Sequence, residues 1–408
     1  MHIGVAGPTS WNALRPWLPE GRDLPPVFTF PLIGRLAAGL RQQGHTITIF
    51  TTSTALSSPA VVEGKAVRVF IAPMRAKRSA YDFYRKERRL LEGAMCASGC
   101  DILHAHWCYE FAAAALDSGR PTLVTAHDNP NEEHHFTRWT RAFPYWWFRC
   151  FFGRQIVRRA PFLSAVSPYV ENNLRQISGP GARIRVIPNG VTPELFQRGQ
   201  DRLAKPIRTE CFTVTSVLEG FGKRKNAQKA LEAFAEFRLR HPKSRYVMFG
   251  GDYQEGGSAH SWARHWGFDT GVDFRGHTPQ SVFFPFLGEQ TDLLLHPALL
   301  ESHPMAVTEA MALGVPVLGG RASGGVSWTL DEGRAGALTD VRDPGLMANA
   351  LEDLANHPEK RAHLARAGWE HARRFFREET MVASYLQAYQ EVLAKTSRAA
   401  MPSTAGRG

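Results

Sequence analysis

Strand-like runs of apolar residues alternate with helix-like patterns along the first half of the chain. Between two of these runs, Leu32, Ile33, Leu36 and Leu40 recur at helical spacing, and Gly44 supplies a stop signal. This alternation predicts a parallel sheet covered by helices on both faces. The runs of the first half lie at residues 2–7, 45–52, 101–107, 121–128 and 162–167.

The second half repeats the pattern after a loop-like stretch at 199–206. We therefore predict an α/β protein with two Rossmann-like, doubly wound domains, over residues 1–200 and 206–378. A last helix at about 380–396 is expected to pack back on the first domain, and 397–408 to form a disordered tail. Ligands of such sheets bind at the carboxyl ends of the strands, so a cleft between the domains is the expected site. The runs of the second half lie at residues 211–218, 246–251, 272–276, 291–297 and 315–320.

Composition is that of an ordinary globular protein. The 408 residues are 43% hydrophobic and 21% charged, which excludes a disulfide module or a disordered chain. No apolar stretch approaches the roughly 18 residues of a membrane span, and the start does not resemble an export signal. Five Cys without a paired CxxC pattern favour the cytoplasm. Cys96 and Cys100 with the HAH sequence at 104–106 have no second ligand pair at zinc-site spacing, so no metal is expected.

The excess positive charge lies in the first half of the chain. Residues 1–205 hold 26 Lys and Arg against 15 Asp and Glu, whereas residues 206–408 hold 23 of each sign. This asymmetry indicates an anionic partner: a phospholipid surface, a phosphorylated acceptor or nucleic acid. The stretches 74–91 and 138–160 interleave basic and aromatic residues, which suits an anionic membrane face or a solvated basic face over an aromatic core. No nucleic-acid-binding module is recognisable, so nucleic acid is not an expected partner.

The segment 291–320 carries the clearest chemistry. Pro304 suits a helix start, and Gly314 with Pro316 ends the helix about ten residues later. The first amides of such a helix can hold a diphosphate. Glu301 precedes that helix and Glu309 lies within it, so the carboxylates could accept hydrogen bonds from sugar and ribose hydroxyls, or simply be two solvated Glu side chains. The backbone expected at the diphosphate comprises His303, Pro304, Met305, Ala306 and Val307.

With its neighbouring motifs, this segment resembles the retaining glycosyltransferases of the GT-B fold that carry two Glu separated by seven residues, a family 4-like group. The resemblance covers nearly the whole chain and implies two domains facing across a cleft. It rests on the stretches DILHAHW (101–107), VTAHD (124–128), IRVIPNGVTPELF (184–196), FGKRKNAQKALEAF (221–234), YVMFGGD (246–252), VDFRGHTP (272–279), 301–320 and 322–336.

The resemblance implies roles for single residues. Glu301 matches the Glu that holds donor-sugar hydroxyls, and Glu309 the Glu that holds the ribose. Lys225 matches the Lys that neutralises the leaving diphosphate, with Lys223 as the alternative. His127 matches the His that lines the reaction centre from the acceptor domain, although a lone strand-end His is more often a core residue. The glycine-rich turns with Gly250, Gly320 and Ser323 are expected to approach the donor, or to be ordinary βα turns.

The chain also departs from the family pattern. Ala298 follows Pro297 where the family has Ser, and His303–Pro304 replaces a Phe-Gly pair, so the donor loop is expected to differ in detail. Glu219 stands where the family often has Arg or Asn. The stretch 10–30 replaces a Gly-Gly turn and could shape the acceptor site.

The expected activity is transfer of a sugar, with retention, from a nucleotide-diphosphate sugar to a glycan or lipid-linked acceptor in bacterial polysaccharide or glycolipid synthesis. UDP-, GDP- and ADP-linked sugars are all candidate donors. No Asp-x-Asp motif occurs, so transfer without metal or other cofactor is expected, in the cytoplasm or peripherally on the inner membrane face. The alternative is a non-catalytic nucleotide-sugar-binding interaction protein. A dinucleotide-dependent oxidoreductase is disfavoured because no Gly-x-Gly-x-x-Gly follows the first strand.

Overall fold

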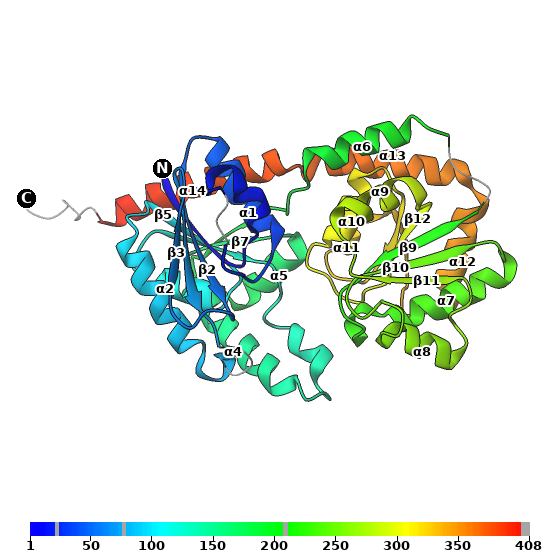
Figure 1. Ribbon diagram of the computed structural model, residues 1–408, viewed down its shortest axis with the longest axis horizontal. Helices are drawn as coiled ribbons and strands as arrows, with labels where there is room; N and C mark the ends of the chain where they lie inside the picture. The colour runs from blue at the N-terminus through cyan, green and yellow to red at the C-terminus, as the bar shows by residue number, and fades with distance from the viewer. Residues whose placement is uncertain (21–23, 76–78, 207–210, 401–408) are drawn as a thin grey trace, which may run out of the picture. The chain divides into compact units, whose positions relative to one another are not determined.

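The structure, a computed structural model, describes residues 1–20, 24–75, 79–206 and 211–400. The chain forms two compact units (Figure 1). Unit 1 comprises Met1–Gly190 together with α14 (Glu378–Ala400), and unit 2 comprises Val191–Arg377. The tail expected at 397–408 lies outside the described residues from 401 onward, and residues 397–400 belong to α14.

Unit 1 is built on a sheet that has eight strands in the described part of the chain, in the order β3-β4-β2-β1-β5-β6-β7-β8. Neighbouring strands run parallel except β3, which is antiparallel to β4. One apolar cluster packs α2 to α5 on one face, and a second packs η1, α1 and α14 on the other. The strands are β1 His2–Ala6, β2 Thr46–Ser53, β3 Ala60–Glu63, β4 Val67–Pro73, β5 Ile102–His106, β6 Thr122–Ala126, β7 Phe162–Ala165 and β8 Arg183–Val186. The helices are η1 Asn12–Trp17, α1 Pro31–Gln42, η2 Ser79–Asp82, α2 Arg85–Ala97, α3 Glu110–Asp117, η3 Glu133–Thr137, α4 Phe143–Arg159 and α5 Pro168–Ile177.

Unit 2 has a parallel sheet with six described strands in the order β11-β10-β9-β12-β13-β14. Figure 1 shows this sheet with α7, α8 and α12 on one side and α6, α9, α10 and α13 on the other, and each set has its own apolar cluster. The strands are β9 Thr213–Val217, β10 Arg245–Phe249, β11 Val272–Gly276, β12 Leu293–His296, β13 Val317–Gly320 and β14 Ala337–Thr339. The helices are α6 Pro193–Leu203, η4 Lys223–Lys225, α7 Ala227–Arg240, α8 Ser258–Trp266, α9 Gln280–Gln290, α10 Met305–Ala312, α11 Val326–Thr329, η5 Asp331–Gly333, α12 Pro344–Asn356 and α13 Pro358–Phe375.

The predicted fold class, two doubly wound parallel α/β sheets, is confirmed. The structure adds strands that the apolar runs do not reveal, among them β3, β8 and β14. These three are short edge strands, and each is only partly buried, so they lack the continuous apolar run of a central strand. The two units divide at Gly190/Val191, ahead of α6, whereas the sequence division lay at 200–206. The indole of Trp369 on α13 donates to the Phe196 carbonyl at 3.1 Å and so ties α6 to unit 2.

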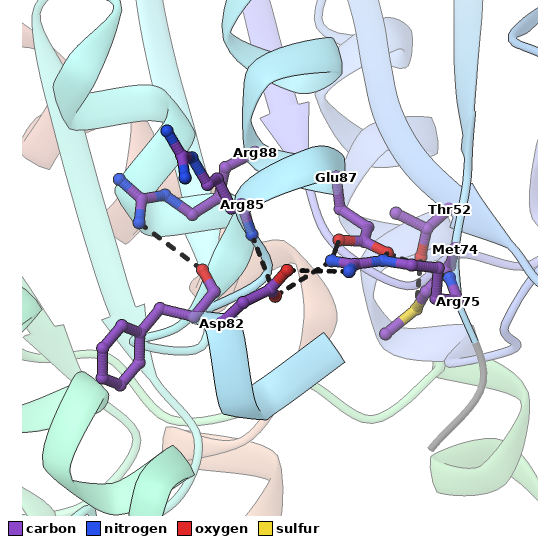
Figure 2. Close-up of polar contacts among 8 residues, drawn as sticks. Thr52, Met74, Arg75, Asp82, Arg85, Glu87 and Arg88 are labelled. Carbon is purple, nitrogen blue, oxygen red and sulfur yellow. Dashed lines mark hydrogen bonds and ion pairs between the residues drawn. The ribbon is translucent and has the colours of Figure 1, made fainter. Parts of the chain in front are cut away.

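A buried carboxylate joins β4 to α2 in unit 1 (Figure 2). The Glu87 side chain is 0% exposed and accepts hydrogen bonds from the backbone N–H of Arg75 at 3.0 Å and from its Nε at 2.9 Å. The same guanidinium donates to Asp82 at 2.7 Å. Arg75 is therefore bonded to carboxylates of unit 1, although it lies in the basic stretch 74–91, for which the sequence suggested either a membrane face or a solvated basic face.

Candidate active site

Glu301 lies in the loop that follows the buried strand β12. Its backbone N–H donates to the Ser323 carbonyl at 3.3 Å, and its own carbonyl accepts from the Gly325 N–H at 2.7 Å. These bonds form an isolated parallel bridge between Glu301 and Gly324. The loop after β13 therefore fixes the backbone that carries the first predicted carboxylate.

The Glu301 carboxylate lies among cationic and imidazole groups. Lys225 Nζ donates to Oε1 at 2.6 Å, His296 Nε2 lies 3.6 Å from the same oxygen, and Arg224 lies 3.8 Å from Oε2. Burial by itself raises the pKa of Glu301, but Lys225 and His296, with Arg224, outweigh it and hold that pKa well below its ordinary value. Glu301 is therefore an ionised, oriented hydrogen-bond acceptor.

The turn η4 holds Lys225 in place. Asn226, the residue after it, adopts a left-handed conformation with φ 56°. Its side-chain amide donates to the carbonyls of Pro297 at 3.1 Å and Val341 at 2.7 Å. This anchors the turn to the loop before Glu301 and leaves Lys223 exposed to solvent. The geometry therefore favours Lys225 over Lys223 as the partner of the carboxylate.

The helix α10 begins where Pro304 predicts. Pro304 is its N-cap residue, and its carbonyl accepts from the amides of Val307 and Thr308, each at 3.1 Å. Val307 is fully buried, while Met305 and Ala306 are half-buried. The amides left for an anion by this pairing are those of Met305 and Ala306, because the Val307 amide is already bonded to Pro304.

His303 and Glu309 take different positions around this helix. The His303 ring is buried, with its centroid 5.0 Å from that of Phe376 and 5.8 Å from that of Trp328, so it supports the helix start from within the core. Glu309 is half-buried one helical turn after Met305. The contacts of His303 and Glu309 with the sugar donor remain predictions.

Close backbone approach explains Gly250. Its φ is +115°, and a Cβ built there would lie 1.7 Å from the Leu218 carbonyl oxygen, so no other residue fits. The next residue, Gly251, donates its N–H to Glu219 Oε2 at 3.1 Å. Glu219, which stands where the family often has a basic or amide residue, therefore braces this turn.

A comparable constraint holds at the end of β13. A Cβ on Gly320 would lie 1.9 Å from Ser323 Oγ. Ser323 is 1% exposed, and its hydroxyl has no hydrogen-bond partner among the described residues. Buried hydroxyls are seldom left unpaired, so this oxygen is a candidate ligand contact beside Glu301.

In unit 1, His127 directly follows β6 and is half-buried. Its Nε2 lies 2.8 Å from Nδ1 of His106, the last residue of β5. Trp107 and Phe30 contact the same ring, with centroid distances of 4.6 and 5.8 Å. From the sequence, HAH was considered as a metal site and as part of a family motif, and the pairing of His106 with His127 was not predicted. The signal was its alternation with His104 along a strand, which puts both rings on one face.

Part of the basic and aromatic stretch 138–160 packs inside unit 1. The Arg149 guanidinium lies 3.7 Å from the centroid of the Tyr109 ring and donates to the Tyr84 hydroxyl at 2.6 Å. Arg149 therefore packs into the aromatic core and belongs to neither of the two surfaces considered for this stretch, the membrane face or the solvated basic face. Trp139 is 90% exposed and Trp147 is 41% exposed, so a membrane contact stays a prediction for the outer residues.

No cluster of three His, Cys, Asp or Glu side chains that could hold a metal ion occurs in the described part of the chain. Across residues 1–400, apart from the three short gaps, no helix is both long and apolar enough to cross a bilayer.

Comparison with known families and proteins agrees with this architecture. Residues 32–195 match the model of Glycosyltransferase Family 4, and residues 205–371 match that of Glycosyl transferases group 1. A D-inositol 3-phosphate glycosyltransferase of Corynebacterium kroppenstedtii is 30% identical over 203 residues, 47% of this chain and 45% of that protein. The protein of the same name from Corynebacterium efficiens is 26% identical over 82% of this chain and 84% of its own length.

Solved structures share the fold. Sucrose-phosphate synthase from Thermosynechococcus elongatus has a TM-score of 0.76 at 18% identity, over 97% of this chain and 100% of that one. Anabaena HepE in complex with UDP-glucose has a TM-score of 0.62 at 17% identity, over 98% and 100%. The fold is thus GT-B. Since the two family models together span both units, the chain belongs to the family 4 glycosyltransferases and is a nucleotide-sugar-dependent enzyme.

Proposed function

We propose that this enzyme transfers a sugar, with retention of configuration, from a UDP-linked donor bound by unit 2. The observation that carries the proposal is the pair formed by Lys225 and Glu301, 2.6 Å apart beside the start of α10. The pair supplies a cation for a diphosphate and an ionised carboxylate that can accept hydrogen bonds from sugar hydroxyls. The first amides of α10 follow in the same loop and can also bind the diphosphate. The UDP-glucose complex of Anabaena HepE, which shares the fold, supports UDP as the nucleotide.

In this proposal each group has one task. Lys225 and the amides of Met305 and Ala306 take up the charge of the diphosphate as its bond to the anomeric carbon breaks. Glu301 orients the sugar through its hydroxyls, and Glu309 holds the ribose. The acceptor hydroxyl oxygen forms the new bond to the anomeric carbon, and its proton passes to an oxygen of the leaving diphosphate. His127 lies on the acceptor-binding unit and contacts the sugar.

We further propose that the acceptor is a glycan or lipid-linked molecule that carries phosphate. The positive excess of residues 1–205, with 26 basic against 15 acidic side chains, supports an anionic acceptor. The similarity to proteins named D-inositol 3-phosphate glycosyltransferase also supports a phosphorylated acceptor. Phosphate is common to lipid-linked and soluble acceptors, and a bacterial envelope acceptor would combine it with a lipid.

A thermal-shift panel of UDP-, GDP- and ADP-linked sugars, followed by a transfer assay with phosphorylated acceptors, tests the proposal. We expect stabilisation by a UDP-sugar, and its loss in Glu301→Gln. The matched control is Glu236→Gln, the same change on the exposed face of α7. Undiminished donor binding and transfer by Glu301→Gln would refute the assigned site.

The peripheral membrane contact can be tested separately. Arg138 lies 5.3 Å from the ring of the exposed Trp139, which places a cation and an aromatic ring together on the surface of unit 1. We expect sedimentation with anionic vesicles, reduced by salt and by Trp139→Ser. Binding that ignores lipid charge and salt would remove the membrane from the proposal.

A further inference from the structure

The rings of three histidines, His104, His106 and His127, form a row along one face of the unit 1 sheet. His104 and His106 are alternate residues of β5, 0% and 1% exposed, with ring centroids 4.1 Å apart. The His127 ring stacks on His106 at 5.1 Å with an interplanar angle of 25°. The shared contact is the 2.8 Å hydrogen bond between His106 Nδ1 and His127 Nε2.

Both members of this pair are neutral. Burial lowers the pKa of His127 to about 3, and burial with the neighbouring histidines lowers the pKa of His106 well below its ordinary value. Each neutral ring carries one N–H. One of the two protons must lie in the shared hydrogen bond, so the other lies on either His106 Nε2 or His127 Nδ1.

The surroundings decide between the two nitrogens. Neither has a hydrogen-bond partner among the described residues. His106 is enclosed, and the neighbouring ring of His104 is already bonded on both sides, to Tyr389 at 2.7 Å and to Thr125 at 2.6 Å. Both nitrogens are buried in the structure. An N–H on His106 Nε2 would stay unsatisfied inside the sheet, whereas His127 is half-buried and directly follows β6, at the sheet edge where the donor sugar is proposed to bind and can accept its N–H.

We propose that His106 is a positioning residue that donates from Nδ1 to His127 Nε2 and so holds His127 as the neutral tautomer with its proton on Nδ1. This inference rests on the proposed function, in which His127 contacts the sugar. It adds the direction of the hydrogen bond in that contact. His127 donates to a sugar oxygen, and it neither accepts a proton nor carries charge. The rings of Trp107 and Phe30 pack against His127 and restrict its orientation.

The tautomer can be measured without any activity. In the full chain labelled with ¹⁵N-histidine, two-bond proton–nitrogen couplings identify the protonated nitrogen of each ring, and His127→Gln assigns the His127 signals. We expect His127 to be protonated at Nδ1 and His106 also at Nδ1. A His127 ring protonated at Nε2, or one that titrates near neutral pH, would overturn the proposal even if the enzyme is an active transferase.

Two variants separate positioning from packing. His106→Asn keeps an N–H near the position of Nδ1, whereas His106→Leu keeps the volume but removes the donor. We expect kcat to fall about tenfold or more in His106→Leu with little change in donor KM, and to stay within about threefold of wild type in His106→Asn. Equal losses in both variants, in proportion to lowered melting temperature, would reduce His106 to a packing residue. If neither variant folds, the wild-type tautomer measurement alone decides.

Discussion

Lys225 and Glu301 are 76 positions apart in the sequence, yet their side chains meet at 2.6 Å, and neither is more than 15% exposed. The contact arises because β9 and β12 are neighbouring parallel strands, so the loops after their carboxyl ends meet at the same edge of the sheet. In the proposed function this ion pair exchanges partners when the donor binds: Lys225 turns to the diphosphate and the Glu301 carboxylate accepts hydrogen bonds from sugar hydroxyls.

Removal of the lysine charge tests this exchange. We expect Lys225→Ala to lower kcat by about 10²- to 10³-fold, because the cation that stabilises the leaving diphosphate is lost. Lys229→Ala, which removes a half-buried lysine in the first turn of α7 that pairs with Glu232, is the control for net charge. We expect Lys223→Ala to cost less than about tenfold, because its side chain is exposed and only steers the anion. A larger loss in Lys223→Ala than in Lys225→Ala would shift the assigned lysine by two residues.

The depressed pKa of Glu301 predicts a pH dependence of stability. The ordinary value is 4.5, and the folded value lies well below it, so the carboxylate stabilises the fold fully above pH 4.5. This contribution is lost as the pH falls below 4.5 toward the folded value, because the unfolded chain then binds the proton first. We expect Glu301→Gln to be less stable than wild type at pH 7, with a difference that shrinks at about pH 4. Urea unfolding of both proteins across this range measures it, and a constant difference would contradict the assignment.

Local features of the site followed from the sequence. Pro304 and Gly314 marked the limits of α10 closely, because a missing amide and a left-handed backbone act within a turn of their own position. The strands before Lys225 and Glu301 were equally recognisable. Their adjacency was not, because strand order depends on how helices pack across the sheet and leaves no local pattern.

Tertiary partners of charged residues were the least predictable feature. Arg149 and Arg75 lie in stretches that read as basic surface, yet one packs on Tyr109 and the other binds the buried Glu87. Sequence spacing identifies a cationic side chain but not the carboxylate or aromatic ring that it contacts in the folded protein. The pairing of His106 with His127 belongs to the same class, because β5 and β6 must first be placed side by side.

The buried carboxylate in Figure 2 predicts a loss of stability without a loss of donor binding. Glu87→Gln should destabilise unit 1 by about 1.5–3 kcal/mol, because charged hydrogen bonds from Arg75 are weakened at a side chain that is 0% exposed. Asp82→Asn, at a carboxylate that is 44% exposed, should cost less than about 1 kcal/mol. Urea unfolding compares the two. Equal costs would show that burial does not determine the strength of this cluster.

The anchoring of α14 to the sheet gives a last prediction. Tyr389 on α14 is the partner of His104 Nδ1 at 2.7 Å, and both side chains are 0% exposed. Tyr389→Phe leaves a buried ring nitrogen unpaired and should lower the stability of unit 1 by about 1–3 kcal/mol. Tyr385→Phe is the matched control, because its hydroxyl lies 3.4 Å from Thr125 Oγ1, a longer and weaker contact. Hydrogen exchange of α14 and of β5 should accelerate together in Tyr389→Phe. Faster exchange in α14 alone would show that the helix is held by its apolar face and that the polar network contributes nothing.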